Sequence, residues 1–60
     1  MSKTRVMIVE DQFTARQLFE MYINSSEKYE IACMVESAAY ADTFAASEHI
    51  DLVIMDILMN

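Results

Sequence analysis

The sequence predicts an α/β fold in which three parallel strands alternate with two helices that cover both faces of the sheet. Three short apolar runs, rich in β-branched residues, are separated by two stretches with helical spacing of their apolar residues. Short connections between successive strands make right-handed crossovers and a parallel sheet the default. The first and third runs both end in carboxylates, so we expect them to be neighbours in a doubly wound sheet of strand order 2-1-3.

The first strand is predicted over residues 5–10, because its long and β-branched apolar residues do not alternate with polar ones. A helix is predicted over residues 12–25, beginning at Asp11 or Gln12. Arg16 and Glu20 are spaced to form an ion pair on its surface. The spacing also predicts a broad apolar stripe made of Phe13, Ala15, Leu18, Phe19, Tyr22 and Ile23.

The second strand is predicted over residues 29–36, and a second helix begins at residue 37 or 38 and ends at about residue 47 or 48. The third strand is predicted over residues 51–57. It has the longest apolar run, so we expect it to be the most buried of the three strands. The inward-facing residues predicted for the second helix are Ala41, Phe44 and Ala45.

Composition restricts the chain to a single small domain of 60 residues. Cys33 is the only cysteine, which excludes an internal disulfide and fits a reducing compartment. The N-terminus has no long apolar segment, so we expect a cytoplasmic protein with no signal peptide and no membrane span. The net charge of −6 argues against direct nucleic-acid binding. The absence of glycine and proline, against about seven from average usage, suggests part of a domain rather than all of one.

The strongest candidate site is formed by Glu10, Asp11 and Asp56, which lie where the first and third strands end. Three carboxylates at one edge of a sheet repel one another unless a cation joins them, and Mg²⁺ takes such oxygen ligands. With that cation, a carboxylate can act as a nucleophile toward a phosphoryl group. Alternatively, Glu10 and Asp11 only cap the following helix, and Asp56 is an incidental polar end to a strand. Spacing alone leaves both interpretations open.

These motifs resemble the receiver domain of two-component response regulators, of the kind that carry a helix-turn-helix output domain. The resemblance rests on residues 6–12, on Arg16 in the helix and on residues 51–60, and it extends over essentially the whole chain. It implies that the chain is the first half of a five-stranded (βα)5 receiver fold, with residues 1–60 forming a partial domain truncated after the third strand.

The resemblance also implies a role for each site residue. Asp56 corresponds to the phosphoacceptor, which receives a phosphoryl group from a sensor histidine kinase with Mg²⁺ as cofactor. Asp11 corresponds to the direct metal ligand, and Glu10 to the acid that holds the metal through water. Leu58 corresponds to the position whose backbone carbonyl ligates the metal. Hydrolases with an aspartate nucleophile fit less well, because Leu58 stands where their second aspartate is needed.

In receiver domains, a hydroxyl residue and a lysine that contact the phosphoryl group follow the fourth and fifth strands. Residues 1–60 do not include those strands. The alternative is therefore an interaction module derived from a receiver domain that is not itself phosphorylated. An unpaired apolar third strand would be a template for pairing with another chain. We expect this strand to associate with the missing second half or with a second copy of the chain. Association with a second copy would form a homo-oligomer.

Overall fold

The computed structural model describes residues 2–55 and shows an α/β fold with a three-stranded parallel sheet of order β2-β1-β3. The elements are β1 (Thr4–Val9), α1 (Phe13–Asn24), β2 (Tyr29–Val35), α2 (Ala38–Ser47) and β3 (Leu52–Met55). The fold class, the element order and the strand order predicted from the sequence are confirmed. Of the predicted third strand, residues 56 and 57 lie outside the described residues.

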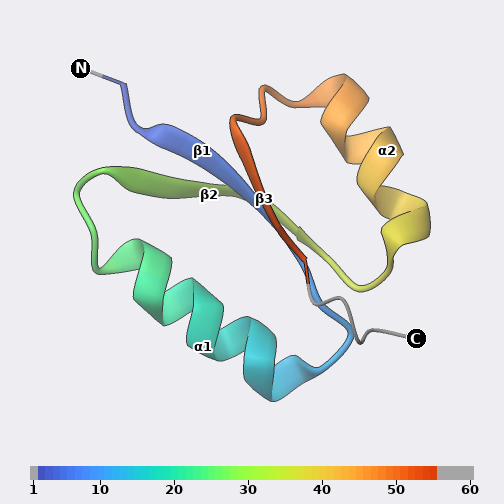
Figure 1. The fold of residues 1–60 in the computed structure, drawn as a ribbon, viewed down its shortest axis with the longest axis horizontal. Helices are drawn as coiled ribbons and strands as arrows, with labels where there is room; N and C mark the ends of the chain where they lie inside the picture. The colour runs from blue at the N-terminus through green and yellow to red at the C-terminus, as the bar shows by residue number, and fades with distance from the viewer. Residues whose placement is uncertain (1, 56–60) are drawn as a thin grey trace.

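The core is built on β1, which lies between the other two strands and between the two helices (Figure 1). Its apolar residues 6–9 are completely buried. Val6 and Ile8 pack with Ile23 of α1 on one face of the sheet, whereas Met7 and Val9 pack on the other face. A strand buried on both faces cannot show the polar alternation of a half-exposed strand, which explains its continuous apolar sequence.

A bulge in β2 keeps its apolar side chains facing the correct layers. The pairing with β1 shifts at Ala32, so that Ile31 lies opposite Val6 and Cys33 lies opposite Met7. As a result, Ile31 packs on the α1 side of the sheet, and Cys33 packs on the α2 side although it is also odd-numbered. One extra residue in a strand reverses the alternation of its side chains.

The prediction that the third strand would be the most buried is wrong. Leu52, Val53 and Met55 are each more than 40% exposed, and only Ile54 is half-buried. Within residues 2–55, β3 pairs with β1 on one side only, and both helices make their close contacts with β1 and β2. The apolar run gave β3 the composition of a buried strand, but its cover is absent from the described part of the chain.

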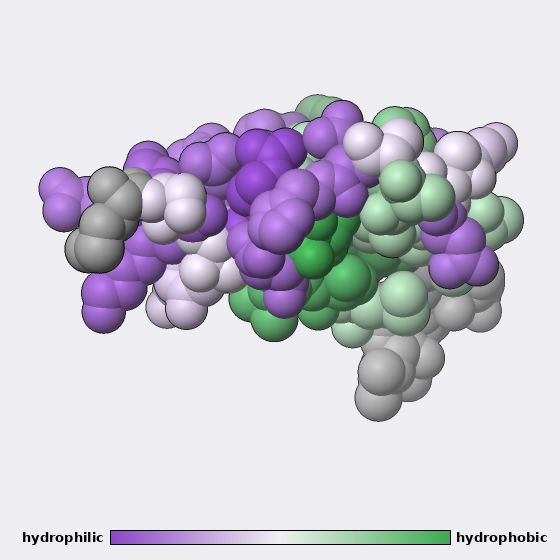
Figure 2. Space-filling model, turned by 90° about the horizontal axis from the view of Figure 1, so that it is seen from above, coloured by the Kyte–Doolittle hydropathy of each residue, from purple (hydrophilic) through white to green (hydrophobic). Residues whose placement is uncertain are grey.

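The helices bury narrower faces than the sequence predicted. In α1, Ile23 is buried and Phe19 packs against the core, but Phe13, Leu18 and Tyr22 of the predicted stripe are exposed. In α2, Ala41 packs inward, whereas Phe44 and Ala45 are exposed. Figure 2 accordingly shows hydrophobic surface open to solvent beside hydrophilic surface. Within residues 2–55, no helix combines the length and apolar character needed to cross a membrane.

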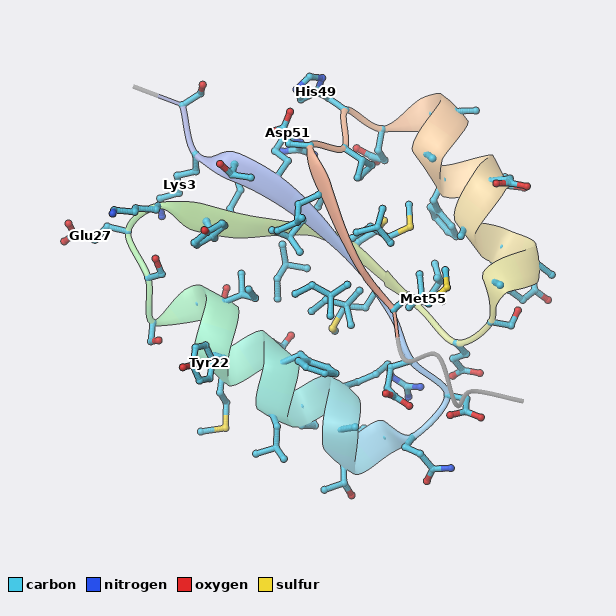
Figure 3. All side chains as sticks on the ribbon, viewed as in Figure 1. Lys3, Tyr22, Glu27, His49, Asp51 and Met55 are labelled. Atoms are coloured by element: carbon cyan, nitrogen blue, oxygen red, sulfur yellow. The ribbon has the colours of Figure 1, made fainter. Side chains whose placement is uncertain are left out.

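The amino ends of the strands are joined by hydrogen bonds around Arg5. Its guanidinium contacts the carboxylates of Glu30 at 2.8 Å and Glu48 at 3.2 Å, and it donates to the carbonyl of His49 at 2.9 Å. Its backbone N–H donates to the Asp51 carboxylate at 2.9 Å, while the Asp51 N–H donates to the Arg5 carbonyl. These contacts fix the start of β3 against β1, at the opposite end of β3 from Met55 (Figure 3).

The difference in burial between β1 and β3 predicts a difference in stability. Ile8 and Ile54 lie directly opposite each other in the sheet, so the same change can be made at both. We expect Ile8→Val to lower the free energy of unfolding by about 1 kcal/mol, because it removes a buried methylene. Ile54→Val should cost clearly less, as measured by urea denaturation at low protein concentration. An equal loss at both positions would show that β3 is covered in solution.

Asp51 predicts a specific pH dependence of stability. The hydrogen bond from the Arg5 N–H is the main cause that lowers the pKa of Asp51 below the ordinary value of an aspartate, and the neighbouring His49 lowers it further. A carboxylate with a lowered pKa stabilises the fold above its unfolded pKa and loses this effect as the pH falls through the folded pKa. Asp51→Asn should therefore be less stable than the wild type near neutral pH, with the difference shrinking below about pH 4. Asp42→Asn in exposed α2 is the control and should show no such convergence.

Candidate functional site

The candidate site begins where β1 ends. Glu10 follows the last residue of β1, and its N–H donates to the carbonyl of Val35 at 3.0 Å, which ties it to the end of β2. Glu10 is only 2% exposed, whereas Asp11 is half-buried in the bend that leads into α1. We call these two residues the acidic turn. It lies at the carboxyl edge of a parallel sheet, where ligands of open α/β folds collect.

The side chain of Glu10 also helps to start α1. One of its carboxylate oxygens accepts a hydrogen bond of 3.1 Å from the N–H of Gln12, the N-cap residue. Gln12 makes no side-chain capping bond itself. The partial positive charge of a helix N-terminus further stabilises a buried carboxylate at this position. Glu10 therefore has the structural role that the capping interpretation assigned to it, and within residues 2–55 its second carboxylate oxygen accepts no further hydrogen bond.

Arg16 is the one strongly positioned cation beside the acidic turn within residues 2–55. Its Nη1 donates to the Glu10 carbonyl at 3.0 Å, and its Nη2 lies 3.7 Å from the carboxylate of Glu36 at the end of β2. The sequence instead predicted a surface pair between Arg16 and Glu20, and that prediction is wrong. Helical side chains lean toward the N-terminus, so an arginine in the first turns of α1 reaches back to the residues that precede the helix.

The other two predicted site residues, Asp56 and Leu58, lie outside the described residues. In the described part of β3, Met55 is paired with Val9 of β1. Glu10 and Asp56 are the next residues along the sequence after this pair. Residues 2–55 contain no group of three side chains placed to hold a metal ion. The three-carboxylate cluster, and the metal-ligating carbonyl of Leu58, therefore stay predictions.

The donors of the acidic turn have the right chemistry for a hard divalent cation. Mg²⁺ prefers carboxylate oxygens and keeps several of its waters, so one or two carboxylates suffice on the protein side. Asp11 is accessible enough to bind a cation directly, while Glu10 is buried and already hydrogen-bonded through one oxygen. This difference in exposure is compatible with the roles that the resemblance implies, Asp11 as the direct ligand and Glu10 as the acid that holds the metal through water.

A separate apolar groove lies on the α1 side of the sheet. It has a volume of about 480 Å³ and is lined by Phe19, Tyr22, Ile23, Ser25, Ser26, Tyr29 and Ile54. Most of these residues come from the last turns of α1 and the start of β2, whereas the acidic turn lies before the first turn of α1. The groove is therefore a distinct feature, and it borders β3 through Ile54.

No protein-family model, no curated protein and no solved structure matched this chain. The resemblance to receiver domains therefore rests on the motifs of this chain. The arrangement of the acidic turn at the end of the central strand is what the structure adds to those motifs.

Proposed function

We propose that this chain is a receiver-type phosphoacceptor module of a two-component signalling pathway. The observation that carries the proposal is the pairing of Val9 with Met55, which places the ends of β1 and β3 side by side. The acidic turn follows one of these ends, and Asp56 follows the other in the sequence. Carboxylates gathered at the carboxyl edge of a parallel sheet suit cation-assisted phosphoryl transfer.

In the proposed reaction, a carboxylate oxygen of Asp56 attacks the phosphorus of a phosphohistidine on a sensor histidine kinase. The nitrogen–phosphorus bond breaks, and its electrons return to the imidazole of the kinase. When bound, Mg²⁺ would neutralise the negative charge on the phosphoryl oxygens. By the resemblance to receivers, Asp11 would hold this cation directly, Glu10 would hold it through water, and Leu58 would offer its backbone carbonyl as a further ligand. In this proposal the chain catalyses no reaction other than transfer of the phosphoryl group to its own Asp56.

The proposal also states which domain family the fold belongs to and where in the cell the protein acts. The α/β arrangement of order 2-1-3 supports an assignment of these residues to the first half of a (βα)5 receiver domain. The net charge of −6 supports a module that contacts other proteins rather than nucleic acid, and the single Cys33 supports a reducing, cytoplasmic setting. Its effect on transcription would then act through a separate helix-turn-helix output domain.

A second candidate function is association through β3, and the exposed edge of that strand favours it. Leu52, Val53, Ile54 and Met55 carry no charge that would block pairing, and acids only flank them. An open strand edge without such protection pairs readily with another strand. The occupant proposed here is a second copy of the chain, because two identical edges can pair antiparallel across a two-fold axis.

The phosphoacceptor proposal predicts Mg²⁺-dependent labelling by a small phosphodonor such as acetyl phosphate. The wild-type chain should acquire a base-labile phosphoryl group, and Asp56→Asn should reduce it to background because the acceptor oxygen is replaced. Asp51→Asn changes the other aspartate that flanks β3 and should still be labelled. Intact-mass spectrometry before and after alkaline treatment measures the product. Labelling that persists in Asp56→Asn, or is absent from the wild type, contradicts the proposal.

The association proposal predicts a dimer that depends on the β3 edge. In sedimentation velocity across a concentration series, the wild-type chain should shift from monomer to dimer. Val53→Lys should remain monomeric, because a charged residue on an edge strand opposes strand pairing. Thr43→Lys adds the same charge to the exposed surface of α2 and should still dimerise. A compact wild-type monomer at every concentration would rule out this candidate.

A further inference from the structure

We infer that Arg16 is a positioning residue for the acidic turn, holding the peptide unit that precedes Asp11 so that the Asp11 carboxylate is aimed at a bound cation. This inference rests on the proposed function, because it concerns the same cation site. It assigns a role to a residue that sequence reasoning placed in a surface ion pair. The geometry of three contacts around the Arg16 guanidinium carries it.

The first contact fixes the backbone. The Arg16 guanidinium donates to the carbonyl of Glu10 at 3.0 Å. That carbonyl belongs to the same planar peptide unit as the N–H of Asp11, so holding the oxygen also fixes the plane from which Asp11 extends. Glu10 is held in addition by its N–H to the Val35 carbonyl and by its carboxylate to the Gln12 N–H. Arg16 is the side chain that completes this three-point attachment.

The other two contacts hold the guanidinium itself. Nη2 lies 3.7 Å from a carboxylate oxygen of Glu36, and the guanidinium carbon lies 5.8 Å from the centroid of the Phe13 ring. The Arg16 side chain is only 14% exposed, although Glu36 is 77% exposed. An arginine is seldom this buried unless its donors are occupied. The guanidinium is therefore fixed between α1, the end of β1 and the end of β2.

The location of Arg16 also argues against a purely helix-stabilising role. A cation near a helix N-terminus opposes the helix dipole, which favours acids there. The first turn of α1 contains no acidic residue that would offset this charge. A positive charge so close to a cation site would moreover repel the cation. Arg16 therefore helps the site only if the geometry it imposes outweighs its charge, and this competition makes the inference testable.

Two substitutions separate geometry from charge. Arg16→Lys keeps the charge but cannot span the Glu10 carbonyl and Glu36 with a planar fork. Arg16→Met removes the charge and keeps an aliphatic side chain of similar length. If positioning dominates, both variants should bind Mg²⁺ about tenfold more weakly, the lower end of the usual effect of groups that orient metal ligands. If charge dominates, Arg16→Lys should match the wild type, and Arg16→Met should bind more tightly.

Mg²⁺ affinity of the full chain is measured by titration calorimetry without a phosphodonor, and urea denaturation of the same variants confirms that each remains folded. Amide exchange of Gln12 gives a readout that does not depend on the cation, and both variants should accelerate it. Arg5→Lys is the matched control at the amino ends of the strands and should leave Mg²⁺ affinity unchanged. Unchanged affinity in Arg16→Lys, or tighter binding by Arg16→Met, overturns the inference alone. A wild-type chain that binds no Mg²⁺ overturns the proposed function with it.

Discussion

The complete burial of β1 is the constraint on which the rest of the structure depends. Residues 6–9 are covered by a strand on each side and a helix on each face, so their side chains define both layers of the core. A strand held this firmly ends at a fixed point, and the first polar residue after it is Glu10. The candidate site is therefore positioned by core packing, because its acids begin where the burial of β1 stops.

The same arrangement explains why β3 is weakly held. In a sheet of order 2-1-3, the central strand gains two neighbours and the third strand gains one. The helices pack on β1 and β2, which leaves an edge whose apolar residues face solvent. The hydrogen bonds around Arg5 anchor the start of β3, yet its far end leads toward Asp56. Any chain that paired with β3 would both cover this surface and steady the third proposed member of the acid cluster.

The sequence was sufficient to predict features that depend on local residue patterns. It was insufficient to predict features that depend on which other elements pack over a strand or helix. The order and type of the elements followed from the apolar runs and their spacing, and the position of the acidic turn followed from the end of β1. The exposure of β3 could not be predicted in this way. An apolar run shows that a strand is suited to burial, but not whether neighbouring elements bury it. The bulge at Ala32 could not be predicted, because after Glu30 the residues of β2 are apolar at both alternating sets of positions. The contact between Arg16 and the Glu10 carbonyl was missed because the i, i+4 rule applies only to residues within a helix. It does not consider residues that precede the helix.

Charge is distributed unequally between the two ends of the sheet, and this asymmetry bears on the proposed cation. At the amino ends, Arg5 contacts Glu30 and Glu48 directly and Asp51 through its backbone. At the carboxyl ends, the Arg16 guanidinium is divided between a backbone carbonyl and Glu36, so it does not neutralise the Asp11 carboxylate. Adding Asp56 to this end would increase the repulsion among its acids. A bound divalent cation would relieve that repulsion, and because it would bind only the folded arrangement, it would stabilise the fold as it assembled the site.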